Sequence, residues 1–199
     1  MTKTIEIYYS FQSPLSYLAL DSLYSLESDF DVELIWQPFS ARASGQQVPG
    51  HPIVMEKLSY LFESTKRYAN YYNLPLRFPE EWPNDEFDPG KVTRGALVAR
   101  DMDVLMEYNY KVFHKIWGLG ENPNDESFMQ ELCEEIDIDL GEFLSKNSSS
   151  DTRERVKNIY KRGKKFEIFD TPTLIMESQR YVGLDIIPFV RELLQDVKK

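Results

Sequence analysis

Two serines, Ser13 and Ser16, lie around a proline directly after an alternating apolar stretch, where a strand leads into a helix. Pro14 suits the first turn of that helix, and Ser13 suits the capping position before it. A helix N-terminus carries about half a positive charge and unpaired N–H groups, which favour an anion placed there. Because no histidine is placed to activate it, the Ser13 hydroxyl is predicted to stabilise an anion rather than to act as a nucleophile. A plain capping role for Ser13 is the alternative, and the two roles are compatible.

Two further segments carry polar groups beside turns. Thr171 and Pro172 precede a short apolar strand, and this position predicts a cis peptide bond between them, although only about 5–6% of such bonds are cis. Asp185 precedes the last predicted helix, and capping that helix is its structural alternative. The single cysteine, Cys133, excludes an internal disulfide, and two histidines do not build an ordinary zinc site. No metal site is therefore predicted.

The 199-residue chain has 42% hydrophobic and 28% charged residues, which predicts one domain, or one small domain carrying an insertion. Its net charge of −10 repels phosphate backbones, and acidic residues flank its densest basic stretch, residues 157–165. We therefore expect no nucleic-acid partner and interpret that stretch as a solvated helix face. No apolar run reaches the roughly 18 residues that span a bilayer, and the first residues do not match a signal peptide. These features predict a cytoplasmic protein without a membrane partner.

Hydrophobic periodicity predicts a β-α-β unit, a long helical segment and a closing α-β-β-α unit. The expected strands cover residues 4–11, 32–36, 174–176 and 180–182. The expected helices cover residues 14–26, a helical segment over 53–145 that breaks at 78–89, residues 151–163 and residues 186–197. Asp151 to Glu154 resemble a capping box that opens the penultimate helix. The apolar stripes of the long segment are expected to pack on each other.

This order of elements resembles an α/β thioredoxin fold (DsbA-like) with an inserted all-α domain. The discontinuous thioredoxin-fold domain would comprise residues 1–40 and 146–199, and the helical insertion domain residues 41–145. Residues 9–19 (YSFQSPLSYLA) resemble the DsbA-type segment in which the first strand leads to Cys-Pro-x-Cys, with Ser13 and Ser16 in place of both cysteines. Residues 169–173 (FDTPT) resemble the Thr-Pro-Thr loop whose proline is cis in that superfamily.

A serine at the first motif position is typical of one branch, which holds 2-hydroxychromene-2-carboxylate isomerases and kappa-class glutathione transferases. Further stretches resemble that branch in the same order along the chain: residues 38–40 (PFS) with 44–50 (SGQQVPG), 74–79 (LPLRFP) and 182–185 (VGLD). The resemblance therefore covers nearly the whole chain.

The resemblance implies a glutathione site in which Ser13 stabilises the glutathione thiolate where the missing cysteine sulfur would lie. The other implied glutathione contacts are Gln46 in the loop, the backbone of Thr171 beside cis Pro172, Leu184 in the last turn, and Asp185 as partner of the γ-glutamyl ammonium. Two residues depart from the family pattern. Asp170 stands where the family usually has glycine, and Leu184 stands where kappa-class members have a serine that contacts the glutamyl carboxylate.

The function implied is a glutathione-dependent isomerisation of the 2-hydroxychromene-2-carboxylate isomerase type, with reversible addition of the thiolate to a small hydrophobic, aromatic or unsaturated electrophile. One alternative is a kappa-class-like glutathione transferase, in which the adduct is the product. Another is a non-catalytic, peptide-binding thioredoxin-fold protein. Serine at both motif positions predicts that the chain is not a dithiol oxidoreductase. By analogy with this branch we expect a homodimer.

Overall fold

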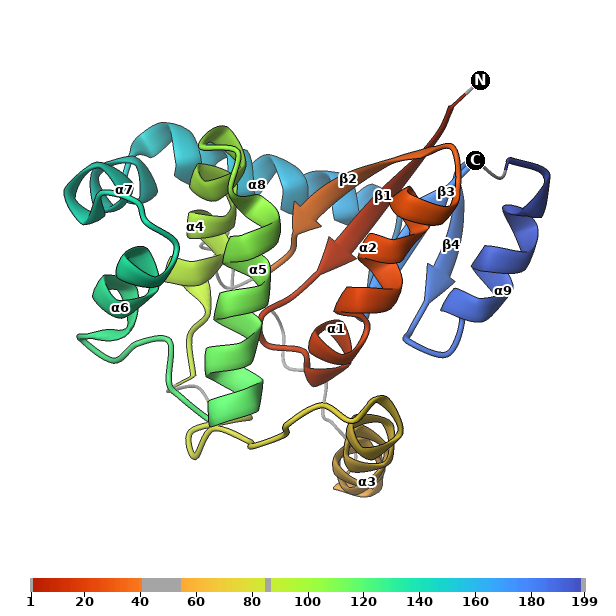
Figure 1. Ribbon diagram of the computed structural model, residues 1–199, viewed down its shortest axis with the longest axis horizontal. Coiled ribbons are helices and arrows are strands. Elements are labelled where there is room, and N and C mark those ends of the chain that lie inside the picture. The colour runs from red at the N-terminus through yellow and green to blue at the C-terminus, as the bar shows by residue number, and fades with distance from the viewer. Residues whose placement is uncertain (1, 41–54, 85–86, 198–199) are drawn as a thin grey trace.

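The computed structural model describes residues 2–40, 55–84 and 87–197, and the described strands form one four-stranded sheet (Figure 1). The strands are β1 (Lys3–Tyr9), β2 (Val32–Pro38), β3 (Thr173–Met176) and β4 (Gln179–Val182), in the spatial order β2-β1-β3-β4. β1 runs parallel to β2 and antiparallel to β3, and β3 and β4 form a hairpin. The parallel pair requires a crossover connection, which the helices between β1 and β2 supply.

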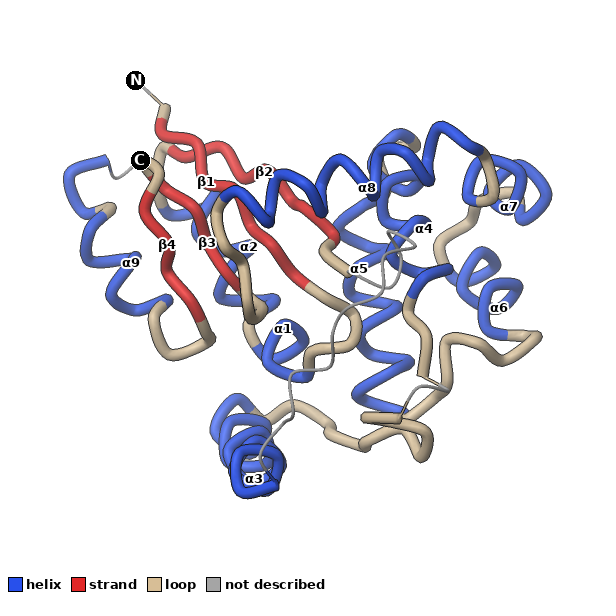
Figure 2. The backbone as a smooth tube through the Cα atoms, turned by 180° about the vertical axis from the view of Figure 1, so that it is seen from behind, coloured by secondary structure: helices blue, strands red, loops and turns tan. Residues whose placement is uncertain are grey.

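Helices cover both faces of this sheet (Figures 1 and 2). On one face lie α2 (Leu20–Asp29), which the short α1 (Pro14–Leu18) precedes, and α9 (Ile187–Leu193), which a 3-10 turn (Gln195–Val197) follows. On the other face lies α8 (Ser150–Lys165), seen in front of the strands in Figure 2. Both faces are therefore closed to solvent over much of their area.

The described chain between β2 and α8 is helical. Its elements are α3 (Met55–Tyr72), α4 (Gly90–Asp101), α5 (Leu105–Phe113), a π-helical turn (His114–Leu119), α6 (Phe128–Glu135) and α7 (Leu140–Asn147). In Figure 1, α4 to α7 stand beside the β2 edge of the sheet, whereas α3 lies apart from them below α1. The division into domains over residues 1–40 with 146–199 and over 41–145 stays a prediction.

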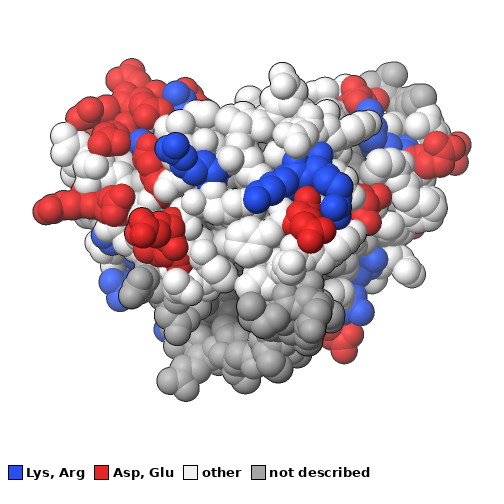
Figure 3. Space-filling model, turned by 90° about the horizontal axis from the view of Figure 1, so that it is seen from below, with Lys and Arg blue, Asp and Glu red and all other residues white. Residues whose placement is uncertain are grey.

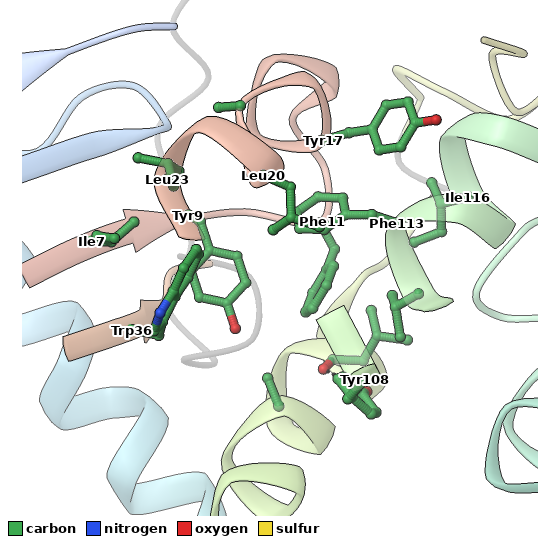
Figure 4. Close-up of a cluster of buried hydrophobic side chains, with 14 of the residues drawn as sticks. Ile7, Tyr9, Phe11, Tyr17, Leu20, Leu23, Trp36, Tyr108, Phe113 and Ile116 are labelled. Atoms are coloured by element: carbon green, nitrogen blue, oxygen red, sulfur yellow. Dashed lines mark hydrogen bonds between the residues drawn. The ribbon is translucent and has the colours of Figure 1, made fainter. Parts of the chain in front are cut away.

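An aromatic cluster joins the helical segment to the sheet (Figure 4). Phe11, just beyond the end of β1, lies 4.8 Å from Phe113 and 6.1 Å from Tyr108 between ring centroids. The hydroxyl of Tyr9 donates a 3.0 Å hydrogen bond to Asn109 of α5. The inserted helices therefore share one continuous core with the sheet, whereas the sequence predicted only that they pack on each other.

Strand β1 is buried on both faces, which the alternation of its residues did not predict. Ile5 and Ile7 face the core under α2, and Tyr8 packs in a second cluster under α8. Glu6, on the same face of the strand as Tyr8, is only 8% exposed. Its carboxylate accepts a 2.7 Å hydrogen bond from Nε of Arg162 and a second bond from Nη2. The basic residues of 157–165 are exposed, as predicted, and Arg162 in addition pairs with the sheet through Glu6.

We expect Arg162→Ala to lower the free energy of unfolding by about 2 kcal/mol, because it leaves a buried carboxylate without its main partner. Among the described residues, Tyr8 would remain as a side-chain donor to Glu6, at 3.2 Å. Chemical denaturation at neutral pH measures this loss. The matched control is Lys161→Ala, since Lys161 forms an exposed ion pair with Glu154 at 3.5 Å, and such pairs contribute about 0.5 kcal/mol. Equal losses in the two variants would contradict a structural role for the pair.

The boundaries near the first strand differ from those predicted. β1 ends at Tyr9, because the next residues turn and the N–H of Ser13 donates to the carbonyl of Ser10 at 3.0 Å. The helix expected over residues 14–26 divides at Ala19 into α1 and α2. Ser13 consequently caps a helix of only five residues.

Two helix starts differ from the sequence analysis, one in its position and one because it was not predicted separately. Ser149 caps α8, and its Oγ accepts a hydrogen bond from the N–H of Thr152 at 3.1 Å, so the capping box predicted at Asp151 is wrong. Asp139 caps α7 through a 2.6 Å bond from the N–H of Glu142, a helix start that periodicity did not separate from the preceding helix. In both cases a hydroxyl or carboxylate satisfies an otherwise unpaired N–H of the first turn.

Candidate active site at the start of helix α1

Ser13 joins two segments that lie 158 residues apart in the sequence. Its Oγ accepts a 3.2 Å hydrogen bond from the N–H of Ser16, as expected of a helix cap. The same hydroxyl donates a 2.8 Å hydrogen bond to the carbonyl oxygen of Thr171. Ser16 is buried, and its Oγ accepts from the N–H of Ser10 at 3.3 Å. Capping and contact with the second segment therefore coexist at Ser13, whereas Ser16 serves only the turn.

The second segment is held by its own hydrogen bonds. The Thr171–Pro172 peptide bond is cis. The N–H of Thr171 donates to Oδ1 of Asp170 at 2.8 Å, and the hydroxyl of Thr173 donates to the carbonyl oxygen of Asp170 at 2.6 Å. The N–H of Gly183 donates to the carbonyl oxygen of Pro172 at 2.9 Å. The turn before α9 is therefore fixed against the loop that faces Ser13.

Two indole groups fix the turn that precedes Ser13. Nε1 of Trp82 donates a 3.0 Å hydrogen bond to the carbonyl oxygen of Gln12, and Nε1 of Trp117 donates a 3.1 Å bond to that of Phe11. Buried tryptophans usually find such a partner. Sequence reasoning missed both residues as part of the site. The aromatic and proline-rich character of residues 78–89 was the only signal near Trp82.

A cavity of about 270 Å³ opens beside Ser13. Its polar wall comprises Ser10, Gln12, Ser13, Ser40, Asp170 and Thr171, and its apolar wall Pro14, Leu15, Phe39, Leu61, Trp82 and Phe169. Figure 3 shows the molecule from below, with acidic side chains gathered mainly at the left, and with Lys and Arg side chains among uncharged residues near the described centre. The cavity thus combines a few polar groups with an aromatic wall, as small-molecule sites commonly do.

The chain matches the DsbA-like thioredoxin domain family over residues 4–195, nearly its entire length. It belongs to that family. The 2-hydroxychromene-2-carboxylate isomerase of Sphingobium xenophagum is 28% identical to it over 204 residues, which are 98% of this chain and 100% of that relative. The fold is therefore the expected DsbA-like thioredoxin fold, with helices inserted between β2 and α8.

Solved structures show the same DsbA-like fold. The structure of a 2-hydroxychromene-2-carboxylate isomerase superimposes with a TM-score of 0.81 at 24% identity, covering 97% of this chain and 95% of that one. The cytosolic disulfide reductase DsbM of Pseudomonas aeruginosa, solved with GSH, gives a TM-score of 0.62 at 17% identity, covering 96% and 99%. At these identities the likeness concerns the fold.

Asp170 lies in the loop that faces Ser13, and its carboxylate accepts a hydrogen bond from the backbone N–H of Thr171. The residue has an exposed surface at the rim of the cavity, beside Phe169, which is 73% exposed. The protein atoms around the carboxyl group nevertheless desolvate it and raise its pKa, and the hydrogen bond from Thr171 opposes this rise. A partly desolvated carboxylate therefore lies at the mouth of the cavity.

The structure separates the remaining predicted glutathione contacts. Leu184 is 2% exposed and packs in the core, so its side chain lacks the exposed surface that the predicted ligand contact would use. Asp185 is exposed in the turn before α9, and Ile186, without a side-chain hydrogen bond, holds the capping position, so the capping alternative for Asp185 is wrong. The pKa of Tyr68 on α3 is raised, mainly because burial desolvates its hydroxyl, and the negative charge of Asp185 adds to this rise. Gln46 lies outside the described residues.

Other reactive groups lie away from the cavity. Cys133 is buried, and desolvation raises the pKa of its thiol to about 11, so it is an inert thiol. Within the described ranges, no three His, Cys, Asp or Glu side chains gather where they could hold a metal ion. No helix of the described chain combines the length and the apolar character needed to cross a membrane.

Proposed function

We propose that this DsbA-like protein is a glutathione-dependent isomerase of the 2-hydroxychromene-2-carboxylate isomerase type. The observation that carries the proposal is the hydroxyl of Ser13, which caps α1, lies on the cavity wall and contacts the backbone of Thr171 at 2.8 Å. A thiol peptide fits this donor set, because Ser13 offers a hydroxyl to the sulfur and Thr171 offers a backbone edge. Asp185 would receive the γ-glutamyl ammonium, and Leu184 would take no part.

The relatives support the isomerase group. Several curated homologues carry the name 2-hydroxychromene-2-carboxylate isomerase, at 28% identity over 91–98% of this chain. The likeness to a structure solved with GSH supports the choice of thiol. Cytoplasmic location and a homodimeric state belong to the same proposal by analogy. A kappa-class-like transferase would use the same residues and differ only in releasing the adduct as product.

Each group of the site has a task in this mechanism. Bound glutathione would supply a thiolate that adds to an unsaturated carbon and leaves after rotation about a bond. Ser13 would turn its hydroxyl from the carbonyl of Thr171 to the sulfur, which frees that carbonyl to accept from the N–H of a bound peptide. The aromatic wall, with Phe39, Trp82 and Phe169, would hold a flat electrophile and exclude water.

The alternative is a non-catalytic, peptide-binding protein that uses the same loop. The N–H of Thr171, which an extended peptide would pair with, is already bonded to Asp170. This contact opposes the binding of glutathione and of any other extended peptide alike, so it does not favour either function.

The first experiment is a calorimetric titration of the full chain with glutathione, together with thiolate absorbance followed across pH. We expect saturable binding and a pKa of the bound thiol below the usual value of about 8.5 for a thiol. S-methylglutathione is the matched ligand control, since it retains the peptide but has no ionisable thiol. Absence of binding at millimolar glutathione would refute the proposed function and leave the peptide-binding alternative.

A further inference from the structure

Both backbone groups of Thr171 are engaged by side chains of the same protein. Its N–H donates to Oδ1 of Asp170, and its carbonyl oxygen accepts from the hydroxyl of Ser13, each at 2.8 Å. A residue that pairs with an extended peptide in the antiparallel manner exchanges both of these groups with its partner. A peptide that docks on Thr171 in this way must therefore displace the bond from its N–H to Asp170, whereas its carbonyl oxygen has a second lone pair and can accept another bond beside Ser13.

The two internal bonds differ in how they are released. The Ser13 hydroxyl leaves the carbonyl of Thr171 by rotation about one bond, and its new partner would be the sulfur of the ligand. The carboxylate of Asp170 gains no new partner on the ligand. Its displacement therefore costs one hydrogen bond unless water replaces the contact. Hydrogen bonds with a charged partner are roughly twice as strong as neutral ones.

The loop itself does not offer another way to free the N–H of Thr171. The carbonyl oxygens on both sides are held, that of Asp170 by the hydroxyl of Thr173 and that of Pro172 by the N–H of Gly183. Thr173 is fully buried in β3. Asp170 has an exposed surface, so its side chain can swing towards solvent while the backbone keeps its position.

We propose that Asp170 is an internal competitor for the thiol peptide: its carboxylate occupies the N–H of Thr171 and so sets the affinity and the selectivity of the site. The inference rests on the proposed function, because it concerns glutathione binding at the same loop. The carboxylate of Asp170 also repels the carboxylates of glutathione. The site therefore weakens the binding of anionic peptides in two ways, by occupying the N–H of Thr171 and by its negative charge.

Two substitutions separate occupancy from charge. Asp170→Ala removes the acceptor and the charge, whereas Asp170→Asn retains an acceptor and removes only the charge. We expect the Kd for glutathione to fall about tenfold in the alanine variant, which corresponds to about 1.4 kcal/mol. The asparagine variant is expected to lie between the alanine variant and the unmodified protein.

The test is isothermal calorimetry of the full chain with glutathione and with S-methylglutathione at fixed pH and ionic strength. The matched control is Glu192→Ala on α9, which removes the same charge from an exposed position of the chain and should leave Kd unchanged. Both Asp170 variants must retain the unfolding midpoint of the unmodified protein within a few degrees. The methylated peptide should show the same gain, because the contact in question involves the peptide backbone.

The outcomes distinguish the inference from the function on which it rests. If both Asp170 variants still bind glutathione with an unchanged Kd, the role of Asp170 is overturned and the proposed function stays intact. Equal gains in the alanine and asparagine variants would overturn occupancy, since charge alone would explain them. Absence of binding in all variants would overturn the proposed function and this inference together.

Discussion

Ser13→Ala is expected to raise the pKa of the thiol of bound glutathione by about 1–2 units. The lost interaction is one hydrogen bond from a hydroxyl to a charged group, worth roughly 1.5–3 kcal/mol, and one pKa unit corresponds to about 1.4 kcal/mol. The helix end adds little here, since α1 has only five residues. In the proposed complex, the hydroxyl of Ser13 would therefore carry most of the stabilisation of the thiolate.

The sign of the pH dependence follows from the thiolate fraction. With a lowered thiol pKa, the proposed glutathione complex would be mostly thiolate at neutral pH, whereas the Ser13→Ala complex would be mostly thiol. We expect turnover of the variant to be about tenfold lower at pH 7 and the difference to shrink above the raised pKa, where both thiols are ionised. Thiolate absorbance and turnover, each followed over pH 5–10, measure the two effects independently.

A control is needed because Ser13→Ala also removes a helix cap, which costs about 1 kcal/mol of stability. Ser149→Ala supplies it: Ser149 caps α8 in the same way, by accepting from an N–H of the first turn at 3.1 Å, and does not line the cavity. The Ser149 variant should lose similar stability and keep the thiol pKa. Ser13→Thr, which retains the hydroxyl, should restore the low pKa. A thiol pKa that is unchanged in Ser13→Ala would exclude Ser13 as the stabilising donor.

Gly95→Ala is expected to destabilise the protein by about 3 kcal/mol or more, although the change adds one methyl group inside a helix. A Cβ built at Gly95 would lie 2.2 Å from the hydroxyl of Tyr108 and 2.8 Å from Cζ of Phe143. Both neighbours are fully buried, and the Tyr108 hydroxyl donates to the carbonyl oxygen of Val92 at 2.9 Å. The methyl group must therefore displace a packed ring or break that bond.

The matched substitution is Gly141→Ala in α7. Gly141 is exposed, and its added Cβ would approach only Oδ1 of Asp139, at 3.3 Å. Alanine normally stabilises a helix interior relative to glycine by roughly 0.5–1 kcal/mol, and this close approach offsets part of that gain. We expect its unfolding free energy to stay within about 1 kcal/mol of that of the unmodified protein. Thermal and urea unfolding of the two variants compare them, and similar stability in both would show that Tyr108 can move aside.

The parts of the fold and site that follow from sequence are those with local signals. The alternation in β1, the Ser13-Pro14 helix start and the Thr171-Pro172 turn each depend on residues within a few positions of one another. The resemblance to DsbA-type proteins then connected the two segments. In the structure, the hydrogen bond from the hydroxyl of Ser13 to the carbonyl oxygen of Thr171 joins these two segments.

The interactions that sequence did not reveal join distant elements. Arg162 reaches Glu6 over 156 residues, and the indole of Trp117 reaches Phe11 over 106. No local sequence pattern indicates such pairs. A charged residue or a tryptophan on a helix has the same neighbours in the sequence whether or not a distant residue binds it in the fold. Asp170 was noted as a departure from the family, but its bond to the next N–H depends on a side-chain rotamer that only the structure provides.

The placement of the three tryptophans has an optical consequence. Trp117 is fully buried and Trp36 stacks on Tyr24 at 4.1 Å between centroids, whereas Trp82 lines the cavity and bonds to the carbonyl of Gln12. A molecule that enters the cavity changes the polarity around the indole of Trp82, whose ring centroid lies 5.3 Å from that of Trp117, whereas Trp36 does not line the cavity. The intrinsic fluorescence of the protein therefore contains a built-in reporter of occupancy, and the part of a ligand-induced change that Trp82→Phe abolishes is the signal from the cavity wall.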